Sequence, residues 1–534
     1  MDGAGVLWSR QMESPLAAIL FTVAALAAGA FAVYFYAPSW RLRRVPGPLA
    51  YGLIGHLPLF TKHGPEVFGV LARRYGPIYR FYLGRQPVVV IADAELCREA
   101  GIKKFKSVVD RSVPSTIRSS PIHFKSLLFT KGSRWQSMRN VIIAIYQPSH
   151  LASLIPAVHP YIRRAARLLH PGQEVAFSDL AVKLFSDTIG QAAFGVDFGL
   201  TKPDDANNVD STINNEKTAT DDFIEKHLYA LTSLKADLNG SLSMVLGTVA
   251  PLLQEPARQL LLRVPGSADR LMDETNRALS GLVDAIVAER AAMEAQSEGE
   301  KKNFLSVLLK ARESSHAMRE LFTADYVSAL TYEHLLAGSG SMSFTLSGLA
   351  YRVAMHPEVE EKMLSEIDAF GPKDLVPDAE ELNTKFTYLE QVLKETMRFY
   401  SSSPLVSRET TEDVEIGGYL LPKGTWVWLA TGQLSKDPKH FPDPYTFRPE
   451  RFDPEDEECK RRHPYAFLPF GIGPRGCPGQ KFAMQQLKLV VIHLYRRYVF
   501  RHSPGMEFPL QLEFSIVNNF KHGVKLQVID REEH

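Results

Sequence analysis

Residues 470–479, FGIGPRGCPG, place a single cysteine in a turn built from glycine, proline and arginine. A thiolate that binds a metal from one side needs backbone amides and cations around it, because these groups stabilise its negative charge. Gly473, Gly476 and Gly479 would let the backbone approach a flat ligand closely. The stretch therefore predicts that Cys477 is an axial metal ligand. The plainer alternative is a loop cysteine in a glycine turn.

The composition of the chain limits the function. Of its 534 residues, 61 are Lys or Arg and 60 are Asp or Glu, which gives a formal net charge of +1. This near-zero net charge gives no excess of positive charge that would indicate a nucleic-acid partner. Hydrophobic residues make up 45%, as in globular chains with a large core, and one large enzyme domain is permitted. Cys97, Cys459 and Cys477 are too few for a disulfide framework or a four-cysteine zinc site, which favours a reducing compartment.

Near the N-terminus, residues 16–37 contain no charged side chain. As a helix, these 22 residues would span about 33 Å and cross the ~30 Å hydrocarbon core of a bilayer. Arg41, Arg43 and Arg44 follow the span, so the positive-inside rule predicts a single-pass anchor with the rest of the chain in the cytosol. A cleaved secretory signal is the alternative, although the apolar segment of a signal is usually shorter.

These features divide the chain into four expected segments. Residues 1–15 form a short luminal N-terminus, 16–37 the transmembrane anchor, 38–50 a basic and proline-rich linker, and 51–534 the catalytic domain. In the linker, the prolines of VPGP (45–48) fix φ and lack an amide donor. The linker is therefore expected to end the helix and to lead stiffly into the catalytic domain.

Periodicity in the catalytic domain predicts a mainly α structure with a minor β-sheet region. Two early runs, residues 77–84 and 86–93, are typical of strands. Longer segments, among them residues 324–356 and 389–400, have helical patterning. Residues 422–469 are rich in proline and aromatic side chains and indicate little regular structure.

The spacing F-x-x-G-x-R-x-C-x-G in residues 470–479 resembles the haem-thiolate signature of the cytochrome P450 family. The resemblance implies the cytochrome P450 fold, haem b as cofactor and Cys477 as the axial ligand of the haem iron. It also implies that Phe470 and Arg475 contact the haem. The other implied participants are O2 as co-substrate and NADPH–cytochrome P450 reductase as electron-donating partner at the endoplasmic reticulum membrane.

Further motifs occur in the order that this family has them. Glu395 and Arg398 form E-x-x-R, and PERF follows at 449–452 with Arg451, so the three resemble the buried Glu-Arg-Arg network of the family. We expect this network to brace the cysteine loop. The remaining matches concern haem propionates and are Trp135 and Arg139 in W-x-x-x-R, together with Arg408.

Residues 337–342, AGSGSM, lie where the family usually has A/G-G-x-D/E-T-T in the helix over the oxygen side of the haem. Gly340 stands at the position of the acid and Ser341 at that of the threonine, while Ala337, Gly338 and Gly340 are small enough to leave room for O2. Ser341 still offers a hydroxyl that can relay protons. The missing carboxylate weakens the argument for proton delivery.

Six segments look like the plant cytochrome P450s that oxidise carlactone in strigolactone biosynthesis: residues 146–156, 191–200, 330–339, 415–428, 461–477 and 518–529. That subfamily usually has A-T-T where this chain has Gly340, Ser341 and Met342. The resemblance implies a small apolar apocarotenoid substrate and successive methyl oxidation of carlactone to carlactonoic acid. Onward products of the deoxyorobanchol or orobanchol type would extend the same chemistry.

Three functions of different classes remain open. The first is a membrane-anchored monooxygenase that receives electrons from a reductase. The second is a haem-thiolate isomerase or dehydratase that acts on a peroxide without a reductase, and the third is a haem-binding protein without turnover. NADPH with reductase separates the first from the others, and a hydroperoxide separates the second from the third.

Overall fold

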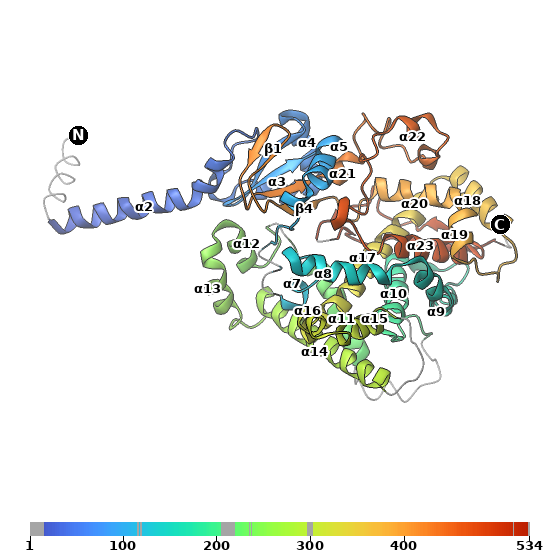
Figure 1. Ribbon diagram of the computed structural model, residues 1–534. Helices are drawn as coiled ribbons and strands as arrows, with labels where there is room; N and C mark the ends of the chain where they lie inside the picture. Colours follow the sequence, from blue (N-terminus) through green and yellow to red (C-terminus); the bar gives the residue numbers. More distant parts are fainter. Residues whose placement is uncertain are drawn as a thin grey trace.

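The computed structural model describes residues 15–114, 117, 120–203, 219–233, 235, 238–295, 303–515 and 517–531. Helices dominate these residues (Figure 1). The α-helices are α2 (Pro15–Arg41), α3 (Leu57–His63), α4 (Val67–Tyr75), α5 (Ala94–Arg98), α7 (Pro121–Phe124), α8 (Gly132–Ile145), α9 (Pro148–Ala166), α10 (Phe177–Ile189), α11 (Ala219–Ser233), α12 (Leu242–Val249), α13 (Pro251–Leu261), α14 (Ala268–Ala295), α15 (Phe304–Glu313), α16 (His316–Leu321), α17 (Ala324–Val353), α18 (Pro357–Ala369), α19 (Ala379–Thr384), α20 (Thr387–Phe399), α21 (Thr431–Leu434), α22 (Glu457–Arg461) and α23 (Gln480–Tyr495).

The strands form small sheets. They are β1 (Ile78–Leu83), β2 (Gln86–Ile91), β3 (Glu174–Ala176), β4 (Val406–Glu409), β5 (Val414–Ile416), β6 (Tyr419–Leu421), β7 (Trp426–Leu429), β8 (Tyr498–His502), β9 (Leu512–Glu513), β10 (Asn519–Phe520) and β11 (Lys525–Asp530). The largest sheet has the order β1-β2-β7-β4, with β2 and β7 parallel and the other pairs antiparallel. Both predicted strand runs, 77–84 and 86–93, are confirmed as β1 and β2.

Short 3-10 and π-helical segments complete the regular structure: η1 (Gly52–Ile54), η2 (Gly64–Glu66), η3 (Glu99–Lys103), η4 (Phe105–Val108), η5 (Gly190–Phe194), η7 (Pro449–Phe452) and η8 (Gly473–Arg475). η7 is the PERF motif itself, and η8 lies within the cysteine motif at 470–479. The mainly helical fold with a minor sheet region is confirmed.

Helix α17 passes through the interior of the molecule (Figure 1). Its side chains are buried around most of its circumference, as expected for a helix that other elements cover on several sides. α10, α14 and α20 pack against it and share one apolar core with it. This rigid helix offers one long face to the site described below.

Helix α2 projects away from the body of the molecule (Figure 1). The helix over Leu16–Arg41 is long enough and apolar enough to cross a membrane. The helix runs through Pro38 to Arg41, so it extends four residues beyond the predicted end at Ala37. Of residues 1–15, which were expected to be luminal, Pro15 begins α2 and residues 1–14 lie outside the described part of the chain.

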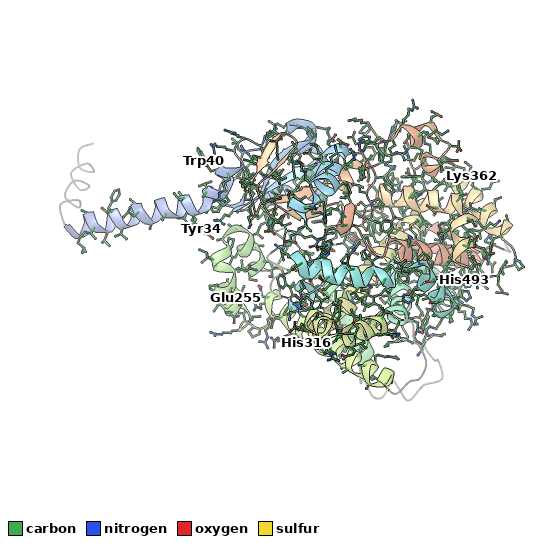
Figure 2. The ribbon with its side chains drawn as sticks, viewed as in Figure 1. Tyr34, Trp40, Glu255, His316, Lys362 and His493 are labelled. Atoms are coloured by element: carbon green, nitrogen blue, oxygen red, sulfur yellow. The ribbon has the colours of Figure 1, made fainter. Side chains whose placement is uncertain are left out.

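Pro38 explains how α2 meets the body. Because proline has no amide hydrogen, it cannot donate to the carbonyl of Tyr34 one turn earlier. The Nε of Arg85 donates to that carbonyl instead, at 2.7 Å. The Arg85 guanidinium also lies over the Tyr34 ring, 4.0 Å from its centroid. Tyr34 and Trp40 mark this junction in Figure 2.

Candidate active site

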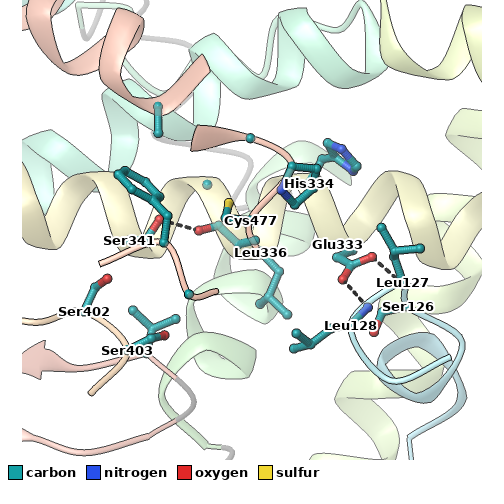
Figure 3. A pocket seen from close by; sticks show the side chains of 18 of the residues that line it. Ser126, Leu127, Leu128, Glu333, His334, Leu336, Ser341, Ser402, Ser403 and Cys477 are labelled. Carbon is teal, nitrogen blue, oxygen red and sulfur yellow. Dashed lines mark hydrogen bonds between the residues drawn. The ribbon is translucent and has the colours of Figure 1, made fainter. Parts of the chain in front are cut away.

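A cavity of about 470 Å³ lies between α17, α8, the residues before β4 and the cysteine loop (470–479). Apolar side chains make up most of its wall, and Cys477 and Ser341 both face it (Figure 3). Such a mostly apolar cavity with a few polar groups is the usual form of a small-molecule site.

The cysteine loop holds Cys477 in a fixed turn. The Cys477 amide donates to the Phe470 carbonyl at 2.8 Å, which closes the loop. Gly473 has a φ of +68°, and a Cβ there would come within 2.3 Å of the Gly101 carbonyl oxygen of η3. Only glycine fits this position. Gly473 is therefore required for packing against η3 and does not line the cavity, whereas Gly476 and Gly479 do.

The Cys477 side chain has exposed surface, and it lines the cavity inside the protein. Burial raises the pKa of its thiol. The Gly479 amide, which donates to the sulfur, and the guanidinium groups of Arg139 and Arg111 act in the opposite direction by stabilising the thiolate. The groups that a metal-binding thiolate requires are therefore present around this sulfur.

Arg475 joins the cysteine loop to the segment before α8. Its guanidinium donates to the carbonyls of Val109, Leu127 and Thr130 at 2.9, 3.3 and 2.9 Å. It also lies 3.8 Å from the centroid of the Trp135 ring. Most donors of Arg475 are thus already used within the protein, although both residues line the cavity.

Three further arginines donate to carbonyl groups of the cysteine loop. Arg408 reaches the Ile472 carbonyl at 3.1 Å, Arg111 the Arg475 carbonyl at 3.1 Å, and Arg139 the Gly476 carbonyl at 2.8 Å. In each of the three guanidinium groups, Nε is buried and has no hydrogen-bond partner in the described structure. Arg139 and Arg111 line the cavity, whereas Arg408 lies behind its wall.

These arginines are crowded together. Burial lowers the pKa of Arg408 well below its ordinary value and that of Arg475 to about 9, and Arg111 lowers both further. Burial also lowers the pKa of Arg111 to about 10. Asp110 pairs with Arg475 at 3.3 Å. The other cations in such proximity require a further anionic partner to remain charged.

Arg111 was not predicted from the sequence. It stands in a polar loop without a spacing motif, so no signal separated it from a surface arginine.

On α17, Ala337, Gly338 and Ser341 line the cavity. Gly340 does not, because its face of the helix is turned toward α11, where a Cβ would come within 3.0 Å of Leu231. The small size of Gly340 therefore leaves space on the side of α17 that faces α11, and not in the cavity where room for O2 was expected. The Ser341 hydroxyl donates to the Ala337 carbonyl at 2.7 Å (Figure 3), and α17 continues through these residues without a break.

Glu333, two turns before Ser341, is a second residue that the sequence analysis missed. Its carboxylate accepts from the Leu127 and Leu128 amides at 2.7 and 2.9 Å (Figure 3). Burial raises its pKa to about 7, although both amides, Arg111 and Arg139 lower it. It joins α17 to the segment before α8 at the arginine edge of the cavity.

The structure brings Glu395, Arg398 and Arg451 together, and all three are fully buried. Arg398 donates to both carboxylate oxygens of Glu395 at 2.7 and 2.8 Å, and the Arg451 Nε donates at 3.2 Å. Their other hydrogen bonds hold the segment 435–458. Glu458, which the sequence analysis missed, pairs with Arg451 at 2.7 Å and supplies the second carboxylate. Buried charges of this kind are tolerated because they satisfy one another.

Comparison with known proteins decides the family. The family model described as Cytochrome P450 matches residues 45–527. The chain belongs to the cytochrome P450 family. A thromboxane-A synthase of Sus scrofa is 28% identical over 523 residues, which cover 91% of this chain and 92% of the relative. Cytochrome P450 3A13 of Mus musculus is 26% identical over 500 residues, which cover 92% of each chain.

Membership implies a haem-thiolate enzyme, and the residues of this cytochrome P450 suit a haem. Within the described residues, no group of three or more His, Cys, Asp or Glu could hold a bare metal ion. A single thiolate suits a metal whose remaining positions a macrocycle fills. The unpartnered Nε atoms of Arg111 and Arg139, which line the cavity, and the crowded charge beside them suit carboxylates of the propionate kind, whereas Arg408, behind the wall, would act only through its charge.

Proposed function

We propose that this cytochrome P450 is a membrane-anchored monooxygenase of plant strigolactone biosynthesis that oxidises carlactone. The motifs in residues 330–339 and 461–477, which look like those of the carlactone-oxidising subfamily, carry the proposal. The largely apolar cavity wall supports an apolar apocarotenoid substrate. The apolar helix α2 supports anchoring in the endoplasmic reticulum membrane with the catalytic domain in the cytosol.

In the proposed site, Cys477 would hold haem b and the arginines beside it would take the propionates. The haem would supply the activation of O2, with electrons from NADPH through NADPH–cytochrome P450 reductase. The residues of α17 form the wall beside that chemistry, and Ser341 places a hydroxyl there. This hydroxyl donates to the Ala337 carbonyl, which leaves its lone pairs able to accept a proton. To hand its own proton on, the hydroxyl would have to rotate away from that carbonyl.

The test is turnover of carlactone by the full chain. Microsomes that contain the protein and reductase are incubated with carlactone, and the products are identified by mass. We expect NADPH-dependent addition of oxygen to one methyl group, in steps that end at carlactonoic acid. Absence of any oxygenated product in a preparation with a full haem-thiolate spectrum would overturn the substrate assignment.

A second candidate function is that of a haem-thiolate isomerase or dehydratase acting on a peroxide. The glycine at position 340, where the family usually has a carboxylate, favours it, because such a reaction needs no proton delivery to O2. The similarity to proteins named thromboxane-A synthase agrees with this possibility. Turnover of a fatty-acid hydroperoxide without NADPH or reductase would support it over the monooxygenase. A haem-binding protein without turnover would process neither substrate.

A further inference from the structure

Five buried polar atoms of cavity-lining side chains have no hydrogen-bond partner within the described structure: Nε of Arg111, Nε of Arg139, Nε2 of His334, Nε2 of His123 and Oγ of Ser126. The last two, of His123 and Ser126, lie on one short segment. Both residues line the cavity, and they are only 4% and 5% exposed. A buried polar group without a partner is costly, so such groups in native proteins usually have a partner from outside the chain. Two of them on one short segment of a substrate cavity indicate a place for a polar group of the ligand.

The segment that carries these atoms is held firmly. The Ser126 amide donates to the His123 carbonyl at 3.2 Å, so the two side chains lie three residues apart on one side of a turn. The Thr130 amide and hydroxyl both donate to the Ser126 carbonyl, at 3.0 and 2.7 Å. The following amides, of Leu127 and Leu128, are bound by Glu333. A ligand would therefore meet a preformed pair of groups.

The surroundings of His123 define its chemistry. Its Nδ1 lies 2.6 Å from the Ser120 hydroxyl, and its ring meets that of Tyr332 edge to face at 6.0 Å. Burial lowers the pKa of His123 to about 4, so the ring is neutral at pH 7 and carries one proton. When the Ser120 hydroxyl donates to Nδ1, that proton lies on Nε2 and requires an acceptor.

We propose that His123 and Ser126 form a polar subsite that binds a neutral carbonyl oxygen, of the lactone or ester kind, at one end of an otherwise apolar substrate. A carbonyl oxygen has two lone pairs and can accept from both groups. A carboxylate fits less well. Burial would remove the water that stabilises its negative charge, and a neutral imidazole ring does not replace that stabilisation. The subsite rests on the proposed function, because it would orient the apolar substrate that the proposed function places in the same cavity.

The position of the subsite agrees with this role. In the view of Figure 3, Ser126 and Ser341 lie on opposite sides of Cys477. A substrate held by its carbonyl at Ser126 would extend its apolar part along α17, toward the wall formed by Ala337 and Ser341. The subsite would thus select which end of the substrate is oxidised.

The test compares two probes that differ only in the carbonyl group: γ-dodecalactone and the matched ether 2-octyltetrahydrofuran. The full-length, haem-loaded protein in lipid nanodiscs is titrated with each, and the substrate-induced change in the haem spectrum gives Kd. We expect Ser126→Ala and His123→Phe each to weaken lactone binding about tenfold and to leave ether binding unchanged, because each removes one buried hydrogen bond. The matched control is Ser186→Ala, which removes a buried, unpartnered hydroxyl of α10 that does not line the cavity.

The proposal is overturned by equal weakening of both probes, which would mean that the two residues only pack against the ligand. It is also overturned if neither probe is weakened, which would mean that water satisfies both atoms. Ser126→Ala removes a single oxygen, so it keeps the test valid even where His123→Phe fails to load haem. If carlactone gives no product while the lactone preference still depends on both residues, the proposed function fails and the subsite stands.

Discussion

At the scale of single residues, the thiolate of Cys477 and the arginines near it have opposite electrostatic needs. Burial opposes both charged forms, as the raised pKa of Cys477 and the lowered pKa of Arg111 indicate. The thiolate and the arginines stabilise each other's charge, so removal of one should disfavour the charged form of the other. Two single substitutions, at Cys477 and at Ser341, test the roles of the thiolate and of the α17 hydroxyl.

We expect Cys477→Ser to abolish the Soret band at about 450 nm that a thiolate opposite carbon monoxide produces in reduced haem. The matched controls are Cys459→Ser, on the short helix α22, and Cys97→Ala, which avoids a buried hydroxyl in the core. Both should keep the band. Retention of the band in the Cys477 variant would show that another group binds the iron.

Ser341→Ala should keep haem binding and the substrate-induced spectral change but lower the product formed per NADPH consumed by roughly tenfold, because it removes the hydroxyl that faces the cavity. The lost electrons should appear as hydrogen peroxide or superoxide. Ser343→Ala is the control, since the Ser343 hydroxyl is buried and donates to the Gly340 carbonyl at 3.0 Å. Unchanged coupling in Ser341→Ala would mean that ordered water carries the protons.

At the scale of elements, periodicity predicted β1, β2, α17 and α20 within a few residues of their bounds, because hydrophobic spacing directly reflects burial. The cysteine motif likewise predicted a tight loop. Contacts between distant segments were not predictable. Arg111 and Glu333 lie in different segments without a motif, and only the fold brings them to the same edge of the cavity. The orientation of Gly340 also depended on α11, which packs against that face.

The link between α17 and the segment before α8 should depend on pH through Glu333. Its pKa rises from 4.5 to about 7 on folding, so the folded protein holds this proton more tightly than the unfolded chain. The stability that Glu333 contributes is therefore fully present below about pH 4.5 and is lost as the pH rises through about 7. The gap corresponds to about 3 kcal/mol as an upper bound.

Thermal unfolding of the wild type and of Glu333→Gln between pH 5 and pH 8 checks this prediction. The Tm of the wild type should fall more steeply with rising pH than that of the variant, which carries no titrating group at this position. Comparison of slopes removes any constant cost of the amide. Parallel profiles would mean that Glu333 is ionised across the whole range.

At the scale of the whole molecule, α2 is not the only apolar surface on its side. α12 and α13 lie on the side of the body from which α2 projects (Figure 1), and Glu255 marks α13 in Figure 2. These two helices carry exposed leucines, namely Leu242, Leu252, Leu253 and Leu260, which are 57%, 71%, 55% and 65% exposed. Apolar groups exposed together in this way are typical of a surface that meets another molecule or a membrane. Together with α2, they would fix the orientation of the catalytic domain against the bilayer.

Removal of residues 1–41 should therefore convert the protein from an integral to a peripheral membrane protein, and not to a freely soluble one. The haem spectrum should persist, because α2 projects outside the body that contains the cavity. The truncated protein should still bind phosphatidylcholine vesicles in a flotation assay, and extraction with carbonate should release it.

Adding Leu252→Ser and Leu260→Ser to the truncated protein should weaken this residual binding by about tenfold or more, since each removes an apolar side chain from contact with lipid. The control pair is Leu375→Ser, in the loop between α18 and α19, and Leu420→Ser, in β6; these leucines are 46% and 62% exposed, and the pair should leave vesicle binding unchanged. If the truncated chain resists carbonate as the full chain does, another segment spans the membrane. If it does not bind vesicles at all, α12 and α13 do not contact lipid, and α2 alone holds the enzyme at the membrane.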